Sequence, residues 1–151
     1  MRSMMMSILP VVAVIAVLGA GVRADGTYGA GVNVQAATKV SDLYASPDKF
    51  VGKTIRVDGV VTSVCTEMGC WVAVKDMVTD QSVRFQAEHD GKIVFPITLK
   101  GKSGSFQGEF VRIAANDMEG HEAAAEHAQS EPKSADFGSR YQIKVTGAVV
   151  Q

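Results

Sequence analysis

Residues 54–76, TIRVDGVVTSVCTEMGCWVAVKD, contain the clearest strand pattern of the chain and both of its cysteines. Between Ile55 and Val61, apolar and charged side chains alternate, which is typical of a strand with one face in the core. Gly59 lies inside this strand, where a residue without a side chain indicates a bulge or a sharp coil. A second strand is predicted from Cys70 to Asp76, so the two strands form a hairpin.

Other predicted elements lie on both sides of this hairpin. Strands are expected at 82–88, 104–115 and 141–150, an extended segment interrupted by Pro96 at 93–99, a short helix at 41–44 capped by Ser41, and a longer helix at 118–129. Several short strands with internal glycines, and one helix before the last strand, are typical of a small closed barrel. We therefore predict a mainly β fold, an OB-like Greek-key β-barrel, with an ordinary β-sandwich as the alternative.

The first 24 residues have the features of a secretory signal peptide. Arg2 supplies a positive start, residues 8–20 are apolar apart from Pro10, and Val22 and Ala24 are small residues suited to a cleavage site. The apolar run is shorter than the roughly 20 residues of a membrane-spanning helix, so an uncleaved anchor is the lesser alternative. We expect an exported protein, periplasmic or secreted, without a stable membrane anchor after cleavage.

For the rest of the chain, we predict an extended N-terminal arm over residues 25–39 and one barrel domain over residues 40–151. The whole chain has 151 residues and a net charge of −1. Loss of Arg2 and Arg23 with the signal peptide leaves 13 basic against 16 acidic residues, a charge of −3 over 127 residues. Because proteins neutralise phosphates with a basic surface, we expect no nucleic-acid partner.

Cys65 and Cys70 enclose four residues, and strand parity directs both sulfurs towards the mouth of one hairpin. In an exported protein such a pair is typical of a disulfide, which here would stabilise the fold by only about 2 kcal/mol because the loop is short. A metal site is the second interpretation. The two thiolates and the Met68 thioether are soft ligands suited to copper before zinc. A redox-active pair is the third, although the spacing is not the CxxC of thioredoxin-like sites.

Two further side chains belong to these hypotheses. His121 is the candidate fourth metal ligand, since His127 lies six residues further, about 120° around the helix, and the two do not share a face as in an HExxH motif. The alternative is a surface histidine on a solvated helix. Trp71 points away from Cys70, either packed over the barrel end or exposed as an anchor for a partner. No nucleophile with its base is evident in the sequence, which favours a non-enzymatic domain over an enzyme and leaves the enzyme as the lesser alternative.

Residues 44–76, with the stretch PDKFVGKTIRVDGVVTSVCTEMGCWVAVKD, resemble an uncharacterised bacterial family of small exported domains with a VGKTVRVEG…VCxxMGCW core. The resemblance extends to KIVFP at 92–96, the helix with histidines, and YQIKVTGAVV at 141–150. It implies an OB-like fold and export, and it implies no particular activity. The residues that it singles out are Cys65, Met68, Gly69, Cys70, Trp71 and, less strictly, His121.

These observations lead to three functional hypotheses. The first is an exported, non-enzymatic domain that binds a transition metal through Cys65, Cys70, Met68 and His121, or docks a protein partner through the same loop. The second is a structural or interaction domain whose Cys65–Cys70 disulfide shapes a recognition loop around Trp71. The third is a thiol–disulfide oxidoreductase.

Overall fold

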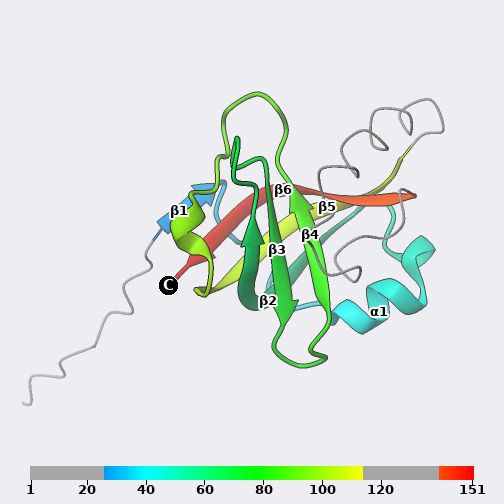
Figure 1. Cartoon of the computed structure of the whole chain (residues 1–151). Helices are drawn as coiled ribbons and strands as arrows, with labels where there is room; N and C mark the ends of the chain where they lie inside the picture. Colours follow the sequence, from blue (N-terminus) through cyan, green and yellow to red (C-terminus); the bar gives the residue numbers. More distant parts are fainter. Residues whose placement is uncertain (1–25, 114–139) are drawn as a thin grey trace, which may run out of the picture.

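The chain is described by a computed structural model over residues 26–113 and 140–151 (Figure 1). Its strands form one sheet in the order β1-β6-β4-β3-β2-β5, and an additional pairing between β6 and β5 closes five of them into a barrel. The elements are β1 (Gly26–Gly29), α1 (Val40–Ala45), η1 (Pro47–Lys49), β2 (Lys53–Val64), β3 (Trp71–Asp76), β4 (Ser82–Gln86), η2 (Ile97–Leu99), β5 (Ser103–Arg112) and β6 (Tyr141–Val150).

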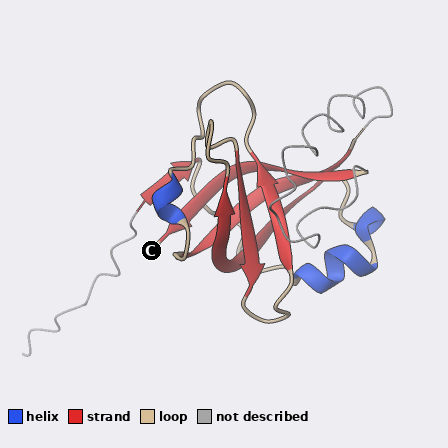
Figure 2. Ribbon diagram, viewed as in Figure 1, coloured by secondary structure: helices blue, strands red, loops and turns tan. Residues whose placement is uncertain are grey.

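The connectivity is that of an OB-like Greek-key barrel. Strands β2, β3 and β4 form a meander, β5 returns to pair with β2, and β6 lies between β5 and β4. The contact between β4 and β6 is parallel and brings Phe85 beside Ile143, whereas the other described strand pairs are antiparallel. Figure 2 shows the strands wrapped around one another with the short helical segments outside. The predicted fold class is therefore confirmed.

The predicted strands differ from the observed ones mainly at their ends. β6 has the predicted bounds, whereas β3 begins one residue after Cys70, and β4 and β5 end earlier than expected. The segment 93–99 contains no strand; its last three residues form the 3₁₀ turn η2 after Pro96, which has no N–H to contribute to a strand ladder. The predicted helix at 118–129 lies outside the described residues.

The bulge expected at Gly59 is not found there. Strand register shifts between Val61 and Ser63 instead, in the pairing of β2 with β3. A Cβ atom at Gly59 would collide with the backbone oxygen of Lys75. The glycine therefore permits close approach of two strands, and the irregularity follows two residues later.

The helix α1 begins at Val40, and the predicted cap at Ser41 is wrong. Lys39 occupies the N-cap position without a side-chain capping bond. The backbone N–H of Val40 donates instead to the carboxylate of Asp76 at the end of β3, at 2.9 Å. A tertiary contact therefore does the work that a local cap does in other helices.

Residues 26–39, the described part of the predicted N-terminal arm, lie against the barrel. Its first described residues form β1, which pairs with the end of β6. The side-chain oxygen of Gln107 accepts hydrogen bonds from the N–H groups of Asn33 and Val34, at 2.9 and 2.8 Å. Arg56 donates to the carbonyl oxygens of Val34 and Gln35. The arm is thus part of the folded unit.

Different segments close the two ends of the barrel (Figure 1). At one end, here called the helix end, Val40 and Leu43 of α1 are fully buried next to the turn between β3 and β4. At the other, the thiol end, Phe95 of the β4–β5 connection (residues 87–102) is buried, with its ring 6.5 Å from that of Phe106. The hairpin loop between β2 and β3 lies at this second end.

Candidate functional site

The cysteine loop, Cys65 to Cys70, connects β2 to β3 at the thiol end. Its ends are held together because the N–H of Cys65 donates to the carbonyl of Trp71 at 3.0 Å. Inside the loop, the N–H of Gly69 donates to the carbonyl of Cys65 at 3.1 Å, and Gly69 has a φ of 61°. This left-handed backbone favours glycine. The sequence therefore folds into a tight turn with one cysteine at each end.

The two sulfur atoms lie close together and are both free thiols. The Sγ atoms of Cys65 and Cys70 are 3.3 Å apart, and the thiol of Cys70 donates to the sulfur of Cys65. A disulfide would bring them to about 2.05 Å. Both side chains are half-buried, so a reagent can reach them from solvent. The hairpin loop thus brings the two sulfurs into direct contact.

The loop is anchored to the β4–β5 connection by backbone hydrogen bonds. The N–H of Phe95 donates to the carbonyl of Gly69 at 2.9 Å, and the N–H of Ala87 donates to the carbonyl of Cys70 at 2.7 Å. A Cβ atom at Gly69 would collide with the backbone oxygen of Phe95 and lie 2.9 Å from Cγ1 of Val94. Glycine is therefore required here both by the backbone angle and by the close approach of the connection.

The environment of Cys65 favours its thiolate. Burial is the largest single influence and opposes ionisation. Hydrogen bonds from the backbone N–H groups of Met68, Cys70 and Glu67, together with the Cys70 thiol, outweigh it and lower the pKa of Cys65 below its ordinary value. Hydrogen bonds to the charged form of a group stabilise that form. Cys65 is therefore the more nucleophilic sulfur near neutral pH.

The environment of Cys70 has the opposite effect. Burial raises the pKa of Cys70, and the neighbouring Cys65, as a hydrogen-bond acceptor and as a charge, raises it further. The side-chain amide of Gln86 partly counteracts this shift. Gln86 also donates to the carbonyl oxygen of Cys70 at 2.9 Å. The two thiols thus differ in acidity although they are in direct contact.

Gln86 is a site residue that the sequence did not indicate. Gln86 lies on β4 and pairs with Trp71 of β3. Trp71 is the residue that follows Cys70. Only the register of these two strands places its amide beside the cysteine loop. A hairpin register derived from the alternating apolar residues of both strands is the one signal that points to it.

Of the predicted metal ligands that lie among the described residues, Cys65 and Cys70 are in contact. The side chain of Met68 is 59% exposed, and His121 lies outside the described residues. Within residues 26–113 and 140–151, no group of three or more His, Cys, Asp or Glu side chains is placed to hold a metal ion. Tetrahedral zinc, with Zn–S bonds of about 2.3 Å, would hold two thiolates roughly 3.8 Å apart. The pair at 3.3 Å is closer than that.

Trp71 begins β3 and is half-buried. The guanidinium carbon of Arg84, on the neighbouring strand β4, lies 5.4 Å from the centre of the indole ring, a cation–π contact. The ring is thus packed against a neighbouring side chain and remains partly accessible. Its predicted role as an anchor for a partner stays a prediction.

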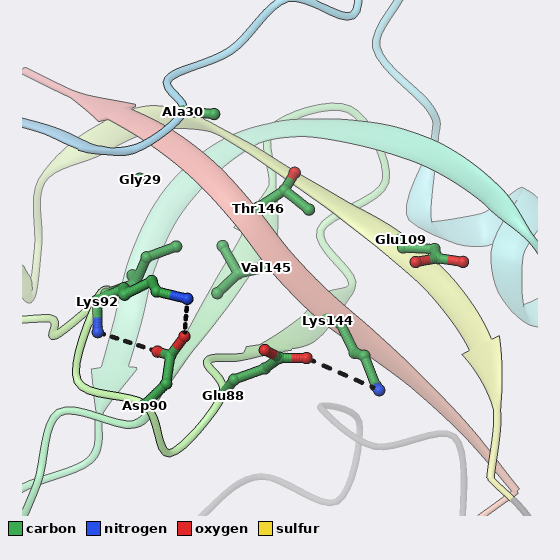
Figure 3. A pocket seen from close by; sticks show the side chains of 10 residues that line it. Gly29, Ala30, Glu88, Asp90, Lys92, Glu109, Lys144, Val145 and Thr146 are labelled. Carbon is green, nitrogen blue, oxygen red and sulfur yellow. Dashed lines mark hydrogen bonds and ion pairs between the residues drawn. The ribbon is translucent and has the colours of Figure 1, made fainter.

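A separate pocket of about 410 Å³ lies between β6 and the β4–β5 connection (Figure 3). It is lined by Gly29, Ala30, Glu88, Asp90, Lys92, Ile93, Glu109, Lys144, Val145 and Thr146. Its lysines face carboxylates: Lys92 lies 2.8 Å from Asp90, and Lys144 lies 4.0 Å from Glu88. Neither cysteine lines the pocket, although the same connection borders both regions.

The fold and the site together define an OB-like barrel with an asymmetric pair of thiols at one end. The chain matches no protein-family model, and no curated protein is significantly similar to it in sequence. Among the described residues, no helix is long and apolar enough to cross a membrane. The predicted signal peptide lies outside the described residues.

Proposed function

We propose that the cysteine loop is a reversible dithiol–disulfide site that exchanges with disulfides outside the cytoplasm. The observation that carries this proposal is the contact of two free thiols, 3.3 Å apart, of which one is more acidic and the other less acidic than an ordinary cysteine. A thiolate attacks disulfides, and a second thiol within reach completes the exchange. Export, expected from residues 1–24, supplies a compartment in which such exchange occurs.

The reaction balances with a disulfide substrate as the oxidant. The Cys65 thiolate attacks one sulfur of the substrate, forms a mixed disulfide, and releases the other substrate sulfur as a thiolate. Cys70 then loses its proton to solvent and attacks the Cys65 sulfur, which frees the second substrate sulfur and leaves a Cys65–Cys70 disulfide. The protein loses two electrons, and the substrate disulfide gains them.

The test is a trapping experiment on the full chain. Reduced protein is mixed with glutathione disulfide, quenched with acid, and analysed by mass spectrometry. The Cys70→Ser variant is expected to accumulate a mixed disulfide at Cys65, because no second thiol resolves it. The wild type is expected to accumulate the internal disulfide, and dithiothreitol to reverse it.

The Cys65→Ser variant is the matched control, with Cys70 as its single thiol. It is expected to form a mixed disulfide more slowly at neutral pH, since the higher pKa of Cys70 leaves a smaller fraction of thiolate. Equal rates in the two single-cysteine variants, or no internal disulfide in the wild type, would contradict the proposal.

Copper(I) binding is a second candidate, favoured by the Met68 thioether in the same loop as the two thiols. Soft sulfur ligands prefer Cu(I) over Zn(II). Anaerobic titration against a chromophoric Cu(I) chelator is expected to give one bound ion per chain, lost in either Cys→Ser variant and weakened in Met68→Leu. Failure of the protein to compete with the chelator would remove this candidate without affecting the exchange reaction.

A further inference from the structure

Exposed apolar side chains lie at the loop that holds the reactive thiols. Met68 and Val94 have large apolar side chains that are 59 and 51% exposed. We call these two residues the apolar rim. Met68 belongs to the cysteine loop, and Val94 belongs to the β4–β5 connection that is bonded to it.

The rim lies directly beside the site of attack. Val94 packs next to Gly69, since a Cβ atom on that glycine would lie 2.9 Å from its Cγ1 atom. The backbone N–H of Met68 is directed to the Cys65 sulfur. Gly69 separates Met68 from Cys70 in the sequence, so the rim residues border the loop that holds both thiols. A substrate whose disulfide reaches Cys65 therefore contacts apolar surface.

Charge selects between classes of substrate. Glu67 is exposed and lies in the loop two residues after Cys65, so the loop carries a negative charge. Glutathione disulfide is anionic and has little apolar surface, so it is repelled by this carboxylate and makes little use of the rim. A polypeptide with apolar residues next to its cystine has the complementary properties.

We infer that the substrate disulfide belongs to an extended polypeptide segment whose apolar side chains, next to the cystine, bind the apolar rim. This inference rests on the proposed exchange function and names its substrate class. The rim supplies binding to the flanking side chains, while Cys65 and Cys70 carry out the exchange.

The test compares three disulfides with the reduced full chain: two neutral peptide disulfides, with leucine or serine flanking the cystine, and glutathione disulfide. The leucine peptide is expected to react about tenfold faster than the serine peptide, as follows from burial of roughly 55 Å² of apolar surface. Glutathione disulfide is expected to be the slowest of the three.

The double variant Met68→Ser/Val94→Ser is expected to bring the leucine-to-serine ratio of rates close to one. Met77→Ser/Val78→Ser is the matched control, because these side chains are 70 and 75% exposed at the helix end. It is expected to keep the wild-type ratio. Circular dichroism verifies that both variants are folded.

Two outcomes would overturn the inference: equal rates for the two peptides with the wild type, or a ratio that the rim variant leaves unchanged. Failure of the proposed function has a different signature. In that case, none of the three disulfides reacts faster with the wild type than with Cys65→Ser.

Discussion

The two ends of the barrel are closed in different ways. At the helix end, the buried carboxylate of Asp76 joins the neighbouring segments. It accepts hydrogen bonds from the N–H groups of Val40 and Val78 and from the hydroxyl of Thr79, at 2.9, 2.7 and 3.0 Å. At the thiol end, Phe95 fills the barrel, and backbone bonds hold a loop with two free thiols.

The polar groups at the two ends have different hydrogen-bond partners. The oxygens of Asp76 are occupied by the protein itself, and these bonds join α1 to the turn between β3 and β4. At the thiol end, the backbone N–H groups of Glu67, Met68 and Cys70 stabilise a sulfur that remains accessible. Hydrogen bonding therefore stabilises the fold at one end and tunes a reactive group at the other.

The largest expected effect concerns the helix end. Asp76→Ala leaves the buried N–H of Val40 and the part-buried N–H of Val78 without an acceptor, and the free energy of unfolding is expected to fall by about 3 kcal/mol. Asp42→Ala, at an exposed position in the first turn of α1, is expected to cost about 0.5 kcal/mol. Urea denaturation measures both values. Similar costs for the two variants would show that Asp76 does not hold this end.

The next effect concerns the thiol end. Gly69→Ala is expected to lower the free energy of unfolding by about 2 kcal/mol, since it strains a left-handed backbone and collides with Phe95. Gly52→Ala is the matched control, because its φ is 77° but no atom lies within 4 Å of its Cβ position. It is expected to cost about 1 kcal/mol. Thermal and urea denaturation compare them, and equal costs would contradict the role of the Gly69–Phe95 contact.

The smallest effect is a pH dependence that separates the two ends. Burial opposes ionisation of Asp76, but its hydrogen bonds lower its pKa in the folded state below the ordinary value of 3.8. Its contribution to stability is thus complete above that unfolded value and is lost as the pH falls through the lower folded pKa. In urea titrations between pH 5 and about pH 2, wild type is expected to lose more stability than Asp76→Asn. Parallel curves for the two proteins would exclude this linkage.

Strand alternation predicted the barrel well because each strand is read from neighbouring residues. Ile55, Val57 and Val61 are buried, as their spacing indicates, and β6 has its predicted bounds. β1 and the start of α1 depend on distant partners: Gly26 pairs with Val150, and the α1 N–H group is accepted by a residue 36 positions later. Such long-range contacts have no local pattern.

The candidate site was also predictable only where it depends on neighbouring residues in the sequence. Strand parity placed the sulfurs of Cys65 and Cys70 together, and both lie in one hairpin loop. Their difference in acidity depends on backbone N–H directions and on Gln86 of another strand, which no side-chain pattern encodes. The sequence therefore located the pair but not the distinct roles of its members.

The most direct test of the central claim is the pH dependence of alkylation by iodoacetamide in the single-cysteine variants. With Cys70→Ser, the remaining Cys65 is expected to titrate below the ordinary thiol pKa of about 8.5, because backbone N–H groups stabilise its thiolate. With Cys65→Ser, the remaining Cys70 is expected to titrate above that value, because burial disfavours its charge. The same midpoint for both variants, or the reverse order, would contradict the assignment of Cys65 as the attacking sulfur.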